Sequence, residues 1–144
     1  MRLPDVNVLI YSHREDAPEH VRYAQWLKGL VAGPEPFAVS ELVLSSFLRL
    51  VTNRRIFQPA TPMDVALEFC QRLIRRPTSV IVRPNSGHWP IFVGLIKASG
   101  VQGALVADAY LAALAIEHGC EFVTTDSDFA RFEGLRWSHP LAPI

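Results

Sequence analysis

Acidic residues without a nearby basic partner are the most informative feature of this sequence. Asp108 lies in the apolar segment "ALVADAYLAALAI" (residues 104–116), and alanine and leucine occupy the positions three and four residues from it. A carboxylate in apolar surroundings is costly in free energy unless a charge compensates it. The same isolation marks Asp5 in "LPDVNVLIYS" and Glu41 in "PFAVSELVLSSFL", while Asp126 and Asp128 follow an apolar segment in "FVTTDSDF".

Three of these positions, 5, 41 and 126, fall at the end of an expected strand or in the turn after it. Since parallel strands bring their carboxyl ends to one edge of a sheet, we expect these acids to converge, with Asp108 joining from the start of its helix. Converging carboxylates repel one another, and a divalent cation relieves that repulsion. Oxygen ligands favour Mg²⁺ or Mn²⁺, and a metal-bound water can hydrolyse a phosphodiester. The missing counter-charge is therefore predicted to be one or two bound ions.

Each acid also has a simpler structural explanation. Glu41 follows Ser40 and could favour a helix N-terminus through the macrodipole, and Asp5, Asp126 and Asp128 could be turn or capping residues. For Asp108 the helix dipole supplies only roughly 0.3–1 kcal/mol, little beside the cost of a buried unpaired acid. The joint pattern favours a site over these separate explanations.

Short apolar segments that alternate with helical patterns must position these acids. Residues 2–5 and the apolar residues after them predict a short buried strand running into a turn, and further strands are expected at 37–39, 79–82 and 121–125, with an edge strand within 135–140. Helices are expected at 18–31, 41–53, 63–76, 86–100 and between Gly103 and Gly119, and residues 126–132 form a loop or short helix. This alternation predicts one α/β domain over residues 1–144, with a short, mostly parallel sheet flanked by helices.

Composition narrows the class of protein. The 144 residues are 49% hydrophobic and 19% charged, with zero net charge, as in a globular protein. No apolar run reaches the roughly 18 to 20 residues of a membrane span, and the N-terminus does not read as a signal peptide. Cys70 and Cys120 lack a CxxC spacing, which argues against a disulfide framework or zinc site. We expect no membrane association and a cytoplasmic, reducing location.

A basic stretch runs from Arg49 to Arg83. It contains seven arginines against two acids, Asp64 and Glu68. Such a stretch can follow a phosphate backbone, or it can be an ordinary solvated surface. Composition alone leaves both possibilities open.

Four segments in order resemble one family. "DVNVLIY", "SELVLSSFLRLVTN", "LVADAYLAALAIEHG" and "FVTTDSDFARFEGLRW" look like PIN-domain proteins of the VapC toxin type, the ribonuclease half of a toxin–antitoxin pair. The resemblance implies a PIN-like three-layer sandwich and a Mg²⁺- or Mn²⁺-dependent endoribonuclease. By motif match it implies that the metal ligands are Asp5, Asp108 and Asp126. Glu41 would complete the catalytic set, either as a metal ligand through water or as a group that orients the hydrolytic water. Asp128 could serve instead of, or with, Asp126.

The resemblance also implies supporting residues. Asn7 would hold Asp5 or its turn in place, and the hydroxyl group that relatives carry near the last acids would come from Thr124, Thr125 or Ser127. Val6 and Ala104 depart from the Thr or Ser and the Asn that many relatives carry there. Neither departure removes a carboxylate, but both change the polar groups around the acids.

Partners follow from the same resemblance. It implies an RNA substrate, a homodimer, and a VapB-like antitoxin that binds in a groove between helices and through which alone the complex would contact DNA. The antitoxin can push a basic side chain into the acidic pocket. Apolar residues that could form this groove, or could equally be core, are Leu44, Phe47, Leu48, Ala66, Phe69 and Leu73.

Two other functions compete with an RNA-cleaving toxin that inhibits growth or translation. A haloacid-dehalogenase-like phosphohydrolase also begins with Asp after its first strand, but it carries a second Asp two residues later, where this chain has Asn7. A PIN-like interaction module without activity would have lost acids, and here none is lost. The residues therefore favour the endoribonuclease.

Overall fold

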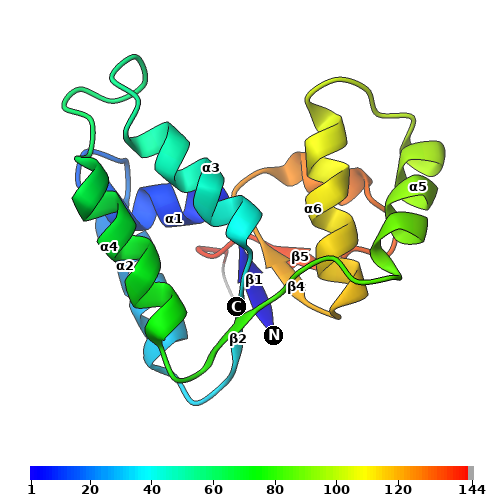
Figure 1. Cartoon of the computed structure of the whole chain (residues 1–144), viewed down its shortest axis with the longest axis horizontal. Helices are drawn as coiled ribbons and strands as arrows, with labels where there is room; N and C mark the ends of the chain where they lie inside the picture. Colours follow the sequence, from blue (N-terminus) through cyan, green and yellow to red (C-terminus); the bar gives the residue numbers. More distant parts are fainter. Residues whose placement is uncertain (143–144) are drawn as a thin grey trace.

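The computed structural model describes residues 1–142. Helices pack on both sides of short central strands (Figure 1). In chain order the elements are β1 (Arg2–Pro4), α1 (Val6–His13), α2 (His20–Ala32), β2 (Phe37–Val39), α3 (Glu41–Val51), α4 (Met63–Arg75), β3 (Ser79–Ile81), α5 (His88–Ser99), α6 (Leu105–Glu117), β4 (Glu121–Val123), the 3₁₀ helix η1 (Ser127–Arg131) and β5 (Trp137–Ser138).

All paired strands run parallel. β1, β4 and β5 form one sheet in that order, with β5 at its edge, and β2 pairs with β3 in a second. β1 contacts β2, and their last residues, Pro4 and Val39, line one small cavity. The carboxyl ends of β3, β2, β1 and β4 therefore follow one another along the middle of the molecule. This is the α/β arrangement that the sequence predicts, and it brings the acids toward one edge.

Two hydrophobic cores lie on opposite sides of the strands. One side is covered by α1 to α4 and the other by α5 and α6 (Figure 1). The first core is drawn from residues 9–73, with Phe37, Phe47 and Val51 fully buried. The second is drawn mainly from residues 82–132, joined by Leu3 and Ala38 from the strands. Leu111 packs against both cores.

Helix α1 corrects the expectation of a strand that continues into a turn after residue 5. Only Arg2–Pro4 are extended, and Val6 begins a helix that ends at His13. Asp5 caps this helix, since its Oδ1 accepts a hydrogen bond from the Val6 amide at 2.7 Å. The segment is apolar on several faces because it is buried, so it lacks the helical periodicity by which a sequence reveals a helix.

Elsewhere the expected elements are confirmed with small shifts at their ends. The second helix begins at His20 rather than Pro18, because Glu19 before it adopts a left-handed conformation with φ of 56°. The strand expected at 79–82 ends at Ile81, and the edge strand is Trp137–Ser138. Within residues 1–142, no helix has both the length and the apolar character needed to cross a bilayer.

Candidate active site

Asp5 lies at the point where β1 ends and α1 begins, and it is only 5% exposed. Its Oδ2 accepts hydrogen bonds from the Thr124 hydroxyl at 2.8 Å and from the Asn7 amide at 3.2 Å. Burial raises the pKa of Asp5 to about 6, an effect that hydrogen bonds from the Thr124 hydroxyl and the Val6 amide only partly offset and to which the charges of Asp108 and Asp126 add. The carboxylate is thus fixed in direction and held in an environment that disfavours its charge.

Thr124 connects the acids of two strands. It is fully buried after β4, and its Oγ1 accepts hydrogen bonds from the Asn7 side chain at 3.2 Å and from the Asp126 amide at 3.1 Å. Asn7 closes the network, since its Oδ1 accepts from the Thr125 amide at 3.2 Å. Of the three hydroxyl residues suggested by sequence, Thr124 is the one that contacts Asp5.

Asp108, in α6, and Asp126, just before η1, both lie near Asp5. Asp108 is half-buried in the first turn of α6, and burial raises its pKa, with the negative charges of Asp126 and Asp128 acting in the same direction. Asp126 caps η1, where its Oδ1 accepts from the Asp128 amide at 2.9 Å. Asp5, Asp108 and Asp126 therefore lie within electrostatic reach of one another. Asp128 is exposed at the rim.

Glu41 differs from Asp5 and Asp126 because it forms an ion pair with an arginine. Its Oε1 accepts a hydrogen bond from Nε of Arg83 at 2.7 Å, and this partner lowers the pKa of Glu41. The expectation that only a bound ion supplies its counter-charge is therefore wrong for Glu41. Asp108, too, feels the positive charge of Arg131, which lowers its pKa against the other causes. Arg83 is distant in sequence from Glu41, and Arg131 is distant from Asp108, so inspection of sequence neighbours could not reveal either influence.

The carboxylate oxygens of the three aspartates suit a hard divalent cation, although their side chains are not close enough together to coordinate one as they stand. Within residues 1–142, no three acidic, histidine or cysteine side chains are placed closely enough to hold a metal ion. The three aspartates nevertheless offer only oxygen donors and repel one another, which is the chemistry that Mg²⁺ or Mn²⁺ satisfies. The residues fit such an ion if their side chains close on it.

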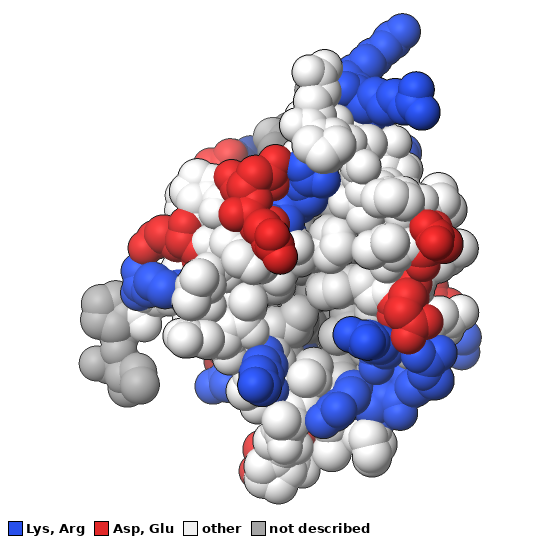
Figure 2. All heavy atoms as spheres, turned by 90° about the vertical axis from the view of Figure 1, so that its left-hand side faces the viewer, with Lys and Arg blue, Asp and Glu red and all other residues white. Residues whose placement is uncertain are grey.

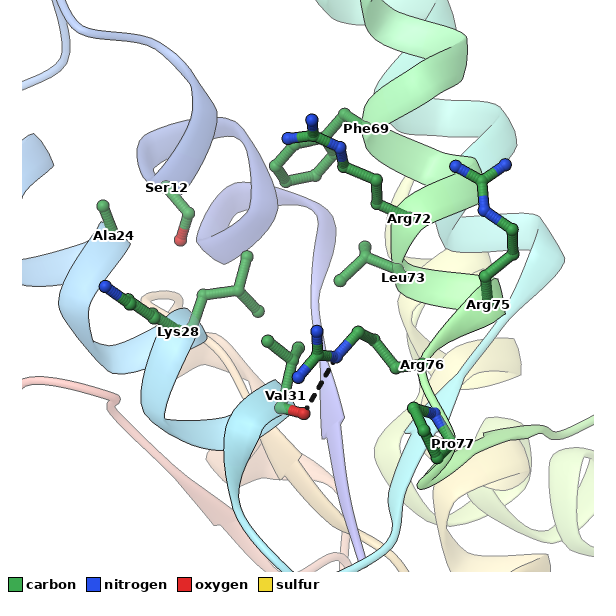
Figure 3. A pocket seen from close by; sticks show the side chains of 11 residues that line it. Ser12, Ala24, Lys28, Val31, Phe69, Arg72, Leu73, Arg75, Arg76 and Pro77 are labelled. Carbon is green, nitrogen blue, oxygen red and sulfur yellow. Dashed lines mark hydrogen bonds between the residues drawn. The ribbon is translucent and has the colours of Figure 1, made fainter.

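A groove between α2 and α4 is the second notable feature. It has a volume of about 580 Å³, an apolar floor that includes Leu27, Phe69 and Leu73, and a basic rim (Figure 3). Arg76 crosses it by donating from Nε to the Val31 carbonyl oxygen at 3.2 Å. Figure 2 shows Lys and Arg side chains gathered on the lower part of this face of the molecule. The basic rim residues are Lys28, Arg72, Arg75 and Arg76.

The sequence could not decide whether six apolar residues form a groove or belong to the core, and the structure now assigns each of them. Phe69 and Leu73 line it, although Leu73 is also largely buried. The others belong to the first core: Leu44, Phe47 and Ala66 are buried, and Leu48 packs against them partly buried. Of the basic stretch, Arg72, Arg75 and Arg76 border the groove, whereas Arg83 lies beside Glu41.

Comparison with known proteins places the chain in one family. The model of the PIN domain matches residues 2–135. The VapC ribonuclease Mb2897 of Mycobacterium bovis is 42% identical over 138 residues, which cover 95% of this chain and 93% of the relative. Ribonuclease VapC25 of Mycobacterium tuberculosis is 41% identical over 140 residues, which cover 97% and 99%.

A solved structure agrees at the level of the fold. The structure of VapBC2 from Rickettsia felis, bound to a DNA fragment from the promoter, includes a chain that superposes with a TM-score of 0.70 at 16% identity, with 96% of this chain and 97% of that chain covered. The chain belongs to the PIN domain family, among the VapC ribonucleases. This membership favours the nuclease over the haloacid-dehalogenase-like alternative.

Proposed function

We propose that this protein is a metal-dependent endoribonuclease and the toxin of a toxin–antitoxin pair. The observation that carries the proposal is the proximity of Asp5, Asp108 and Asp126, which come from three separate elements. They lie close enough together that the charges of Asp108 and Asp126 raise the pKa of Asp5. The ribonuclease names of relatives at 41–42% identity support the choice of RNA as substrate.

The proposed roles follow from the position of each side chain. Asp5, Asp108 and Asp126 would hold one or two Mg²⁺ or Mn²⁺ ions, which supply a water of lowered pKa and stabilise charge on the phosphate oxygens. Thr124 and Asn7 fix the direction of the Asp5 carboxylate through their hydrogen bonds. Glu41 orients the attacking water once it is released from Arg83, and Asp128 at the rim acts with or in place of Asp126.

Substitution of single acids tests this site. Asp5→Asn and Asp108→Asn should each abolish cleavage of RNA and weaken Mn²⁺ binding measured by calorimetry, while circular dichroism remains that of the wild type. Undiminished cleavage by either folded variant, or cleavage that persists in excess EDTA, would refute the assignment. If the wild type binds Mn²⁺ and cuts no RNA, the chain is an inactive interaction module instead.

The α2–α4 groove is proposed as the binding site of a VapB-like antitoxin. A segment with apolar side chains and acidic residues would complement its apolar floor and basic rim. The charge-reversal variant Arg72→Glu should weaken binding of the antitoxin at least tenfold and leave RNA cleavage intact, because Arg72 lies away from the acids. Arg54→Glu, in the exposed loop between α3 and α4, is the matched control. Contact with DNA would occur only through the antitoxin.

We also propose that the protein is a cytoplasmic homodimer. Cys70 and Cys120 are free and buried, which suits a reducing compartment. Trp89, at the start of α5, exposes 64% of its surface, and a tryptophan so exposed is typical of an interface.

A further inference from the structure

Arg83 lies at the same edge of the sheet as the acids. It comes two residues after the end of β3, and Val82 still donates to the Val39 carbonyl oxygen of β2 at 2.9 Å. The Arg83 carbonyl oxygen is held by Nε2 of His118 at 2.7 Å. The Glu117 carboxylate accepts from the Asn85 amide at 2.8 Å. These contacts anchor the backbone of the loop on the end of α6, whereas the Arg83 side chain is 62% exposed.

A second arginine borders the acids on the opposite flank. Arg131 is the last residue of η1, and it donates from Nε to the Asp128 carbonyl oxygen at 3.0 Å. Its guanidinium also lies 3.7 Å from the Asp128 carboxylate. It is close enough to Asp108 to lower the pKa of that carboxyl group.

These groups lie in a row because β3 pairs with β2, β2 contacts β1, and β1 pairs with β4. Arg83 follows β3, Glu41 follows β2, Asp5 follows β1, and Asp126 with the η1 residues follows β4. The edge therefore carries Arg83 at one end, the acids in the middle, and Arg131 at the other end. An RNA strand whose scissile phosphate lies over the aspartates would place neighbouring phosphates toward the two ends of this row.

Both arginines can exchange their present partners for phosphate. The Arg83–Glu41 and Arg131–Asp128 pairs are solvent-exposed, and water screens such pairs, so they are weak. A guanidinium binds phosphate oxygens through two parallel hydrogen bonds, which makes phosphate a strong competitor. Arg72 and Arg75 also form solvent-exposed pairs, with Glu68, but they lie beside the α2–α4 groove and not at the sheet edge.

We propose that Arg83 and Arg131 bind the RNA phosphates on either side of the scissile phosphodiester, and that Arg83 thereby releases Glu41 for the reaction. This inference rests on the proposed nuclease function. It assigns the RNA contacts to two arginines at the sheet edge rather than to the basic stretch as a whole.

Binding measured without cleavage tests the inference. A fluorescently labelled single-stranded RNA of 12 nucleotides is titrated with the Asp5→Asn protein in EDTA over a series of KCl concentrations. Each phosphate contact contributes about 0.7 to the slope of log affinity against log salt for a single strand. Arg83→Ala and Arg131→Ala should each lower that slope by about 0.7, and the double variant by about 1.4. Arg83→Lys should retain most of the slope, because it keeps the charge.

Arg22→Ala is the matched control, since Arg22 forms an equally exposed pair with Glu19 on α2, away from the sheet edge. Its slope should equal that of the parent. Glu41→Gln should tighten RNA binding by freeing Arg83, and Arg83→Ala should still weaken binding in that background.

Two results would overturn the inference: slopes of the Arg83 and Arg131 variants equal to that of the Arg22 control, or an Arg83→Ala effect that vanishes in the Glu41→Gln background. Cleavage of RNA by the wild-type protein in excess EDTA, measured separately, would instead refute the proposed metal-dependent function, and it leaves the salt slopes of the Asp5→Asn proteins interpretable.

Discussion

Asp5 places a carboxylate where burial opposes its charge. Its pKa of about 6 in the folded protein lies above the ordinary value of 3.8, so the folded state binds this proton more tightly than the unfolded state does. The free energy of unfolding of the metal-free protein therefore falls as pH rises from about 4 to about 6, and it stays lowered at higher pH. The difference in pKa corresponds to about 3 kcal/mol.

Asp5→Asn should accordingly stabilise the metal-free protein while it abolishes cleavage. At pH 8 we expect the free energy of unfolding to rise by roughly 1–3 kcal/mol, less than the full difference because the amide pairs imperfectly with Asn7. At pH 4 the variant and the wild type should nearly coincide. Urea denaturation at both pH values measures this. Asp64→Asn, at an exposed position, should show no such pH-dependent gain, and an equal gain in it would contradict the explanation.

Thr124→Val should shift the acid side of the pH–rate profile for RNA cleavage to higher pH. The Thr124 hydroxyl lowers the pKa of Asp5, so its removal lets that pKa rise and protonates Asp5 at a higher pH. Activity at pH 6.5 should fall more than activity at pH 8.5. Loss of the buried hydrogen bonds should also cost roughly 1–3 kcal/mol of stability. Thr124→Ser keeps the hydroxyl and should preserve the profile; a parallel shift in it would assign the effect to packing.

At the scale of the element, α3 shows how a helix start positions a reactive group. The Ser40 hydroxyl is buried and accepts from the Val43 amide at 3.4 Å, which fixes the first turn that carries Glu41. Ser40→Ala should lower the free energy of unfolding by about 1 kcal/mol. Chemical denaturation measures the loss, and Ser40→Thr, which retains a capping oxygen, should recover most of it. Equal losses in both variants would show that the cap does not matter.

Some helices and strands could be predicted from the sequence, and others could not. The strand at 37–39, the strand expected at 121–125 and observed over Glu121–Val123, and the helix of Asp108 were predictable, because their apolar patterns and their flanking Gly or Ser residues are local signals. Helix α1 was missed because burial on several faces removes its periodicity. Glu41 was judged unpaired because Arg83 lies 42 residues away in sequence, and only the parallel pairing of β2 with β3 brings the two together.

At the scale of the whole molecule, the proposed dimer depends on a surface that the single chain leaves exposed. Trp89→Glu should convert a dimer into the 16.1 kDa monomer in sedimentation experiments, because it places a charge in an apolar contact. Val21→Glu, on α2, replaces an apolar residue that is equally exposed at 64% and should remain dimeric. A Trp89→Glu protein that still sediments as a dimer would place the interface elsewhere.

The division into two cores has a consequence for synthesis on the ribosome. The buried residues of the first core all lie within residues 9–73, so this core can begin to condense while the remainder of the chain is still being made. Asp5 and Glu41 border that part, but Asp108 and Asp126 belong to elements of the second core, which closes only when β4 pairs with β1. A nascent chain therefore lacks the complete set of acids for most of its translation, and we expect the proposed nuclease activity to arise only with the last segment, at the stage when an antitoxin can already meet a formed α2–α4 groove.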